Sequence, residues 1–453
     1  MAILQDALKG LKGFLRPAGL SDRARTLVIR CVAAFVLHSG RMSASQGAQA
    51  IRTEPCHRAQ IGRFLKRAWW EKRGLLGHIQ PTVLAMESQS GEFVVIVDST
   101  FCSQQGRSIE NTFSTGNRQR RPRKGRRYSS KKHTRKCVHG FVCGLLITPS
   151  GMRIPFVKKY LTKDTCKKRG VKHRTQTELA AEIIAELELP AGAKLVVLGD
   201  TAFDADSIRE ACEKHKAAWI TPVNPERVLA GPKPRPKVRS LLEKLNPQQF
   251  VTMRLHPGRG KLVPYRRLSP HRVGPKAKAR TYYVHGERRA VQSVGEVLLV
   301  VSTTEKPKKG ESLHEPKILM TNDLSLSPQR LVELYGLRWQ IELFFKELKS
   351  TLGLHQYRFK DFCQVEHWVD LVLTTFLYLE WNRARQLAHP DLTEQQRRWW
   401  TSQRTHGLCQ AVRHSSELHD LLTIRERLKT PGGIRKLART LQDALPLEMR
   451  TAI

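Results

Sequence analysis

One segment of the chain carries four polar residues whose spacing could serve chemistry on a long substrate. Residues 334–349 contain the pattern Y-x2-R-x3-E-x6-K, formed by Tyr335, Arg338, Glu342 and Lys349. On a helix that turns about 100° per residue, all four fall within an arc of roughly 60°. At about 1.5 Å per residue, the stripe is roughly 20 Å long. One carboxylate between positive charges over that length suits a nucleic-acid backbone better than a small molecule.

The residues around this stripe predict one continuous helix. Ser327 can cap its start, Pro328 fits the first helical position, and Gly353 follows the last periodic apolar residue, Leu352. An adjacent apolar face would anchor the helix on a core. The alternative interpretation is an ordinary amphipathic helix whose solvated face carries charge.

Two aspartates elsewhere favour a catalytic role for this stripe. Asp98 and Asp200 each follow a short, unbroken apolar run, in residues 92–97 and 194–199. Such runs predict strands buried on both faces, and the carboxyl ends of these strands are where open α/β sheets place their sites. A strand-end aspartate often only caps the next turn. Two of them together with Glu342 nevertheless form a candidate site of three carboxylates.

Three carboxylates are a suitable donor set for metal-assisted phosphodiester chemistry. Two Mg²⁺ ions about 3.5–4 Å apart can hold the attacking and leaving oxygens in line. Mg²⁺ prefers oxygen ligands and keeps several waters, and Mn²⁺ can substitute for it. In our assignment Asp98 bridges the two ions, Asp200 binds one and Glu342 binds the other.

Together these six residues resemble the DDE transposases of bacterial insertion sequences, of the insertion-sequence-four type or a close relative. The resemblance covers roughly residues 90–385 and matches the helix signature at all four positions. It implies an RNase H-like catalytic core that moves DNA, with the three carboxylates in the metal positions. It also implies that Tyr335, Arg338 and Lys349 contact DNA phosphates beside the scissile bond. By the same analogy, the chain would act as a homodimer on transposon ends and target DNA.

Composition agrees with a polyanionic partner. Lys and Arg number 79 against 40 acidic residues, which gives a net charge of +39. DNA binding by such a chain should depend strongly on salt. Ribosomal and nucleoid proteins are as basic, but they need no buried strands that end in aspartate. The scattered cysteines and the absence of an apolar stretch of about 20 residues indicate a cytoplasmic protein with no membrane partner. The resemblance implies that this cytoplasm is bacterial and that the protein is associated with the nucleoid.

The order of predicted elements defines an α/β fold, an RNase H-like core interrupted by a β-rich insertion, with helical regions at both ends. We expect a helical DNA-binding region at 1–85 and the core at 86–224 and 323–389, separated by an insertion at 225–322. A helical region follows at 390–453. Within the first part of the core, βββαβαβ order places Asp98 on the first strand and Asp200 on the fourth.

Two basic segments are further candidates for DNA contact. A helix-turn-helix is predicted in residues 43–67, with Arg58, Arg63, Lys66 and Arg67 on its second helix. Its alternative is a helical bundle with a solvated basic face. Eleven of the twenty residues 117–136 are Lys or Arg, and this predicted loop includes Arg123, Lys124, Arg126 and Arg127.

Three functions remain compatible with the sequence. The first is a transposase that cleaves transposon ends and transfers strands into target DNA. The second is a domesticated RNase H-like nuclease without strand transfer, and the third is a catalytically inactive basic DNA-binding protein. The resemblance also implies an aromatic in the insertion that stacks on a flipped base, but no Trp occurs there. Tyr282, Tyr283 and Trp339 are the candidates, although a packing role is expected for the two tyrosines and a place in the core for Trp339.

Overall fold

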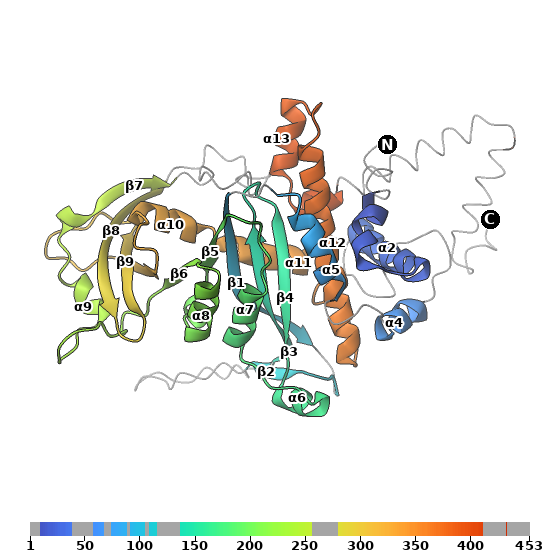
Figure 1. Ribbon diagram of the computed structural model, residues 1–453, viewed down its shortest axis with the longest axis horizontal. Helices are drawn as coiled ribbons and strands as arrows, with labels where there is room; N and C mark the ends of the chain where they lie inside the picture. The colour runs from blue at the N-terminus through green and yellow to red at the C-terminus, as the bar shows by residue number, and fades with distance from the viewer. Residues whose placement is uncertain are drawn as a thin grey trace, which may run out of the picture. The chain divides into compact units, whose positions relative to one another are not determined.

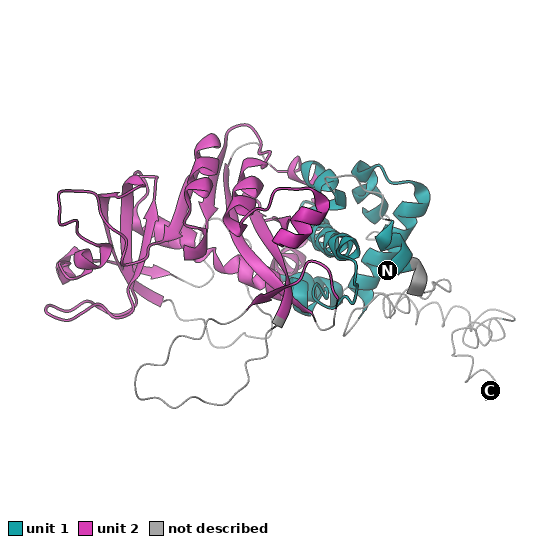
Figure 2. Cartoon of the chain, turned by 90° about the horizontal axis from the view of Figure 1, so that it is seen from below, with its two compact units in different colours: residues 1–82, 347–389, 403–453 teal, residues 83–346, 390–402 magenta. Residues whose placement is uncertain are grey.

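The chain forms two compact units (Figure 2). Its computed structural model describes residues 10–38, 58–67, 74–87, 91–104, 108–115, 136–255, 280–410 and 432. Unit 1 comprises Met1–Thr82, Glu347–His389 and Gln403–Ile453, and unit 2 comprises Val83–Lys346 and Pro390–Ser402.

Unit 2 is built on a mixed sheet (Figure 1). Its first strands are β1 (Gly91–Gln104), β2 (Phe113–Thr115), β3 (Lys136–Ile147), β4 (Arg153–Tyr160), β5 (Ala193–Leu198) and β6 (Ala218–Pro222). β3 is antiparallel to β1 and to β4, whereas β5 runs parallel to β1, and β6 runs parallel to β5. The spatial order β4-β3-β1-β5-β6 is the predicted RNase H-like arrangement, so the α/β fold class is confirmed.

Two helices that pack against each other also pack against this sheet: α7 (Gln176–Ala185) and α8 (Asp206–Lys214). The shorter α6 (Lys163–Arg169) precedes α7, and η2 (Thr201–Phe203) precedes α8. A capping box of Thr175 and Glu178 begins α7, which then packs against β1, β3 and β4. A Cβ atom at Gly144 of β3 would lie 2.7 Å from Cγ2 of Ile183 on α7. The helix can therefore approach the strand this closely only because residue 144 is glycine.

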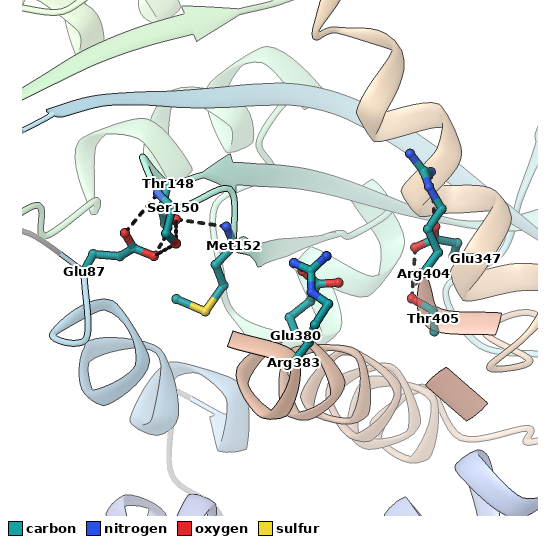
Figure 3. A network of polar contacts seen from close by, with 9 residues as sticks. All are labelled: Glu87, Thr148, Ser150, Met152, Glu347, Glu380, Arg383, Arg404 and Thr405. Atoms are coloured by element: carbon teal, nitrogen blue, oxygen red, sulfur yellow. Dashed lines mark hydrogen bonds and ion pairs between the residues drawn. The ribbon is translucent and has the colours of Figure 1, made fainter. Parts of the chain in front are cut away.

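A polar network fixes the turn between β3 and β4 (Figure 3). The Glu87 carboxylate accepts hydrogen bonds from the Thr148 hydroxyl at 2.6 Å and from the Ser150 amide at 3.3 Å. The Thr148 hydroxyl oxygen in turn accepts from the Met152 amide at 3.1 Å. These bonds hold the hairpin in the register that also places β3 beside β1.

The predicted β-rich insertion contains the expected strands, and they continue the same sheet. It consists of α9 (Val238–Leu242), η3 (Pro247–Gln249), β7 (Val251–Leu255), β8 (Arg280–Val291), β9 (Gly295–Thr303) and β10 (Lys317–Thr321). β10 is antiparallel to both β6 and β9, and β8 and β7 follow outward from β9. The described part of the sheet thus has ten strands.

The signature segment forms two helices rather than the single predicted one. These are α10 (Pro328–Gly336), capped by Ser327 as expected, and α11 (Trp339–Ser350). Between them the amide of Arg338 donates to the carbonyl of Tyr335 at 3.0 Å, and the amide of Ile341 donates to that of Arg338 at 3.3 Å. Such bonds to the third preceding residue turn the chain by about 120° per residue. The prediction of one uniform stripe was therefore wrong at this junction.

Unit 1 is helical, as predicted for the N-terminal region. Its described helices are η1 (Arg16–Ala18), α2 (Asp22–Leu37), α4 (Arg58–Lys66), α5 (Gly74–Leu84, whose last two residues belong to unit 2) and α12 (Phe362–Leu387). The remaining described helix, α13 (Glu394–Ser402), belongs to unit 2. Trp368 of α12 packs edge-on against Phe35 of α2. Of the helices that the structure describes, none is both long enough and apolar enough to cross a bilayer.

Polar side chains also tie the helices of unit 1 together. Asp370 on α12 accepts hydrogen bonds from the amides of Leu75 at 2.6 Å and Leu76 at 3.0 Å, and thereby caps the start of α5. Glu347 accepts from the hydroxyl of Thr405 at 2.9 Å, as Figure 3 shows. These contacts join segments that are far apart in the sequence into one helical core.

Candidate active site

The two predicted aspartates lie at the same level of neighbouring parallel strands, but Asp98 is inside β1, which continues to Gln104, rather than at the strand end that the sequence predicts. Ile96 of β1 is opposite Leu198 of β5, and Asp98 and Asp200 each stand two residues further along the chain. Gly199 directs the chain toward β6, where its amide donates to the carbonyl of Ile220 at 3.2 Å. The strand pairing therefore places the two aspartates beside each other, where β5 has ended and β1 continues.

Asp98 lies in a partly buried environment shared with other carboxylates. Its Oδ1 accepts a hydrogen bond from the Ser99 amide at 2.7 Å. Burial raises the pKa of the Asp98 carboxyl, the Ser99 bond and the Arg338 charge lower it, and the charges of Asp200 and Glu342 raise it again. Mutual repulsion of this kind is typical of carboxylates arranged to share a cation.

Asp200 has a local structural role as well. It caps η2, since its Oδ1 accepts a hydrogen bond from the Thr201 amide at 2.5 Å. Asp200 thus has the capping role that is the alternative interpretation of an aspartate after a strand. It leaves the second carboxylate oxygen available, and the charge of Asp200 still acts on Asp98 and on Arg338.

Arg338 connects the aspartate of β1 with the glutamate of α11. One terminal nitrogen lies 2.8 Å from Oε1 of Glu342, and the other lies 3.8 Å from Oδ2 of Asp98. Burial alone would lower the pKa of Arg338, but the hydrogen bond to Glu342 and the surrounding negative charges raise it. The guanidinium therefore stays charged and serves as the counter-ion of this carboxylate group.

Tyr335 and Lys317 complete the group of polar side chains around the carboxylates. Tyr335 is 7% exposed, and its burial raises the pKa of its hydroxyl group. The Arg338 charge lowers this pKa, and the charges of Asp200 and Asp98 raise it. The Nζ atom of Lys317, at the start of β10, lies 4.6 Å from the centroid of the Tyr335 ring. Sequence analysis missed Lys317, because nothing in the local pattern of a predicted strand marks its first residue as part of a distant site.

The remaining predicted DNA contacts that the structure describes belong to unit 1. Lys349 is in the last turn of α11, in the part of that helix that belongs to unit 1. Arg63 and Lys66 are on the exposed face of α4, where Lys66 forms an ion pair with Asp361 at 3.2 Å. Arg58 begins that helix, but its side chain lies outside the described residues.

Two predicted basic features fall on residues that the structure does not describe. The first helix of the proposed helix-turn-helix, near residues 43–51, lies outside the described residues. So does the basic loop with Arg123, Lys124, Arg126 and Arg127. Of the predicted helix-turn-helix, the structure describes only α4, with Arg63 and Lys66 exposed, and the residue after it, Arg67.

Trp339 is a correction to the sequence analysis. Its side chain was expected in the core but is 54% exposed. The tightened turn just before it changes the rotation of the chain, so the face predicted for a uniform helix no longer applies at this position. An exposed aromatic therefore directly follows Arg338 in the chain.

The side chains present have the chemistry of a magnesium site. Within the described ranges, no three His, Cys, Asp or Glu side chains are close enough to hold a metal ion as they stand. Asp98, Asp200 and Glu342 supply only oxygen donors, which Mg²⁺ prefers. The Arg338 guanidinium already balances the charge of two of them. The donor set therefore fits the metal, provided that Arg338 gives up its ion pairs.

Comparison with known proteins agrees with this chemistry. No curated protein matches the chain. The family model described as the transposase DDE domain matches residues 89–377, which is more than half of the chain and includes all three carboxylates. Members of this family bind DNA and catalyse its transposition, with the help of divalent metal ions. The chain thus belongs to the transposase DDE domain family.

Proposed function

We propose that this transposase cleaves the ends of its own mobile element and joins them to target DNA, using Asp98, Asp200 and Glu342 as the metal-binding residues. The observation that carries the proposal is the placement of Arg338 between Asp98 and Glu342. Carboxylates from a central strand and from a separate helix converge on one cation there. A stable fold alone would not require that convergence, because replacing such a partly buried group by apolar residues is often neutral or stabilising.

The three carboxylates would divide the work between two ions. In our assignment Asp98 would be a ligand of both Mg²⁺ ions, Asp200 of one and Glu342 of the other, and Mn²⁺ could replace Mg²⁺. The ions would neutralise charge on the attacking and leaving oxygens of the phosphodiester. The protein would supply the fixed positions of the ligands, since Asp98 and Asp200 extend from a buried, paired sheet.

The basic and aromatic residues would hold the DNA. With the carboxylates engaged as metal ligands, the Arg338 guanidinium would be free to bind a phosphate next to the scissile bond. Tyr335 and Lys349 would contact neighbouring phosphates. Arg58, Arg63, Lys66 and the basic loop of Arg123, Lys124, Arg126 and Arg127 would hold more distant parts of the duplex.

The reaction class follows from these roles. Water would first hydrolyse one strand at the element end and leave a 3′-hydroxyl, which would then attack a target phosphodiester in a transesterification. Two ends must be joined, so a homodimer assembled on DNA is the expected working form. The expected location is the bacterial cytoplasm, in association with the nucleoid.

One assay separates this function from its two alternatives. The purified chain is incubated with Mg²⁺, a labelled duplex that carries the terminal inverted repeat flanking its gene, and a supercoiled target plasmid. Cleavage at the repeat and covalent joining of the label to the plasmid are expected. Cleavage without joining would indicate a nuclease, and binding without cleavage would indicate an inactive DNA-binding protein.

A further inference from the structure

Lys317 occupies a fixed position beside the candidate active site. It is the first residue of β10, which lies between β6 and β9 in the sheet. The next four residues of that strand, 318–321, are buried. The carbonyl of Lys317 accepts a hydrogen bond from the Ser302 hydroxyl at 3.4 Å. The backbone of Lys317 is thus held by the core, while its side chain reaches solvent.

The ring of Tyr335 gives the Lys317 side chain a platform. The ammonium nitrogen lies 4.6 Å from the ring centroid, within the range of a cation–π contact. Tyr335 itself is almost fully buried, so the ring is a rigid surface. A long, flexible lysine side chain is thereby directed toward the carboxylate group.

The charges around Lys317 differ from those around Arg338. Burial and the nearby Arg338 charge lower the pKa of Lys317, and the Asp200 charge raises it, so the ammonium lies within electrostatic reach of both. Among the described residues no carboxylate forms an ion pair with Lys317, whereas Arg338 is engaged by two. Of the two cations, Lys317 is the one available to an incoming anion.

We propose that Lys317 binds a phosphate of the DNA held at the active site, and that the Tyr335 ring positions it for this contact. This inference rests on the proposed function, because the anion is the backbone of the DNA to be cut. In the competing structural role, the lysine stem merely covers the Tyr335 ring and the ammonium is solvated. The two roles differ in whether DNA binding depends on the charge at position 317.

The test compares Lys317→Met, which keeps the length of the side chain and loses its charge, with Lys317→Arg. Lys194→Met is the matched control, since Lys194 is exposed near the amino end of β5, away from Asp200. The affinity for the end duplex is measured over a salt series in the full-length chain. For Lys317→Met we expect an affinity about tenfold lower and a salt slope lower by about one. Lys317→Arg should keep the affinity and the salt slope of the wild type, and Lys194→Met should change neither quantity.

A change on the DNA confirms that the contact is direct. The phosphates around the scissile bond are replaced one at a time by neutral methylphosphonates. At one position, the methylphosphonate should lower the affinity of the wild-type chain for the duplex but leave the affinity of Lys317→Met unchanged. This readout would not respond to a purely structural role, and thermal melting of each variant checks the fold.

The outcomes distinguish the inference from the function beneath it. If Lys317→Met keeps the wild-type affinity, salt slope and methylphosphonate profile while the wild type cleaves DNA, the inference is wrong and the proposed function stands. If Lys317→Met does not fold, Lys317→Gln takes its place, and an unchanged salt slope of DNA binding for that variant contradicts the inference. The inference is also contradicted if no single methylphosphonate lowers the affinity of the wild type. If the wild type binds but does not cut DNA with Mg²⁺, the proposed function itself fails.

Discussion

The guanidinium of Arg338 donates a hydrogen bond to Oε1 of Glu342 at 2.8 Å, across four residues of the signature segment. Arg338 lies in the tightened turn between α10 and α11, and Glu342 lies in the first turn of α11. The pair therefore joins the two helices at the place where the polypeptide also meets Asp98. The signature thus encodes a connection to the sheet as well as the proposed contacts with DNA.

We expect Asp98→Asn, Asp200→Asn and Glu342→Gln each to reduce cleavage of the end duplex to the level without protein. Each change removes a charged oxygen ligand, whereas phosphate contacts by Lys and Arg provide most of the DNA affinity. Binding should therefore remain within a few fold of the wild type in gel-shift titrations. A variant that still cuts DNA with Mg²⁺ would remove its residue from the catalytic set.

Replacement of Arg338 should separate metal binding from DNA binding. Arg338→Gln removes the competing cation, so the Mn²⁺ affinity of the DNA-free chain should rise roughly two- to fivefold, as expected for loss of a partly exposed ion pair. The affinity is measured by titration calorimetry or by the resonance signal of free Mn²⁺. An unchanged or lower Mn²⁺ affinity would mean that Arg338 does not compete with metal.

Arg330 provides the matched control for that experiment. Its guanidinium also bridges two carboxylates, at 2.6 Å from Glu92 and 3.2 Å from Glu333. Glu92 is near the amino end of β1, several residues before Asp98. Arg330→Gln should therefore leave the Mn²⁺ affinity unchanged.

Lys349→Ala should weaken binding to the end duplex and lower the salt slope by about one, because one phosphate contact is lost. Metal affinity should not change, since Lys349 donates no ligand. The measurement is a set of binding isotherms over a salt series, with Lys194→Ala as the control. Unchanged affinity and slope would show that this end of the stripe is a solvated helix face.

Asp370→Ala should lower the free energy of unfolding by about 1–2 kcal/mol, as loss of a helix cap does. The change leaves the amides of Leu75 and Leu76 without the carboxylate that accepts their hydrogen bonds. Denaturant unfolding measures the loss. Asp370→Asn keeps an acceptor oxygen and should cost less, and an equal loss for both variants would indicate that the negative charge matters more than the hydrogen bonds.

The parts of the site that the sequence predicted are those fixed by local rules. Unbroken apolar runs identified β1 and β5 because a sheet covered on both faces needs no polar alternation. The aspartates that follow those runs lie side by side because the two runs pair in parallel register, although β1 continues beyond Asp98. Ser327 was recognised as the cap of α10 for a similarly local reason.

The parts that were missed depend on tertiary contacts. The turn at Arg338 arises where this residue contacts Asp98, and no helix propensity encodes that contact. The exposure of Trp339 follows from the same turn. Lys317 reaches the site only because β10 pairs with β6 within the sheet, an arrangement that a linear reading of the insertion does not reveal.

The close approach of α7 to β3 limits the size of the side chain that β3 can carry beside Asp98. Cys143, the strand partner of Asp98, immediately precedes Gly144, where Ile183 leaves no room for a methyl group. A larger residue at 144 would push apart the helix and the strand against which Asp98 is aligned. The position of the Asp98 carboxylate thus depends on the absence of a side chain at Gly144 of the neighbouring strand.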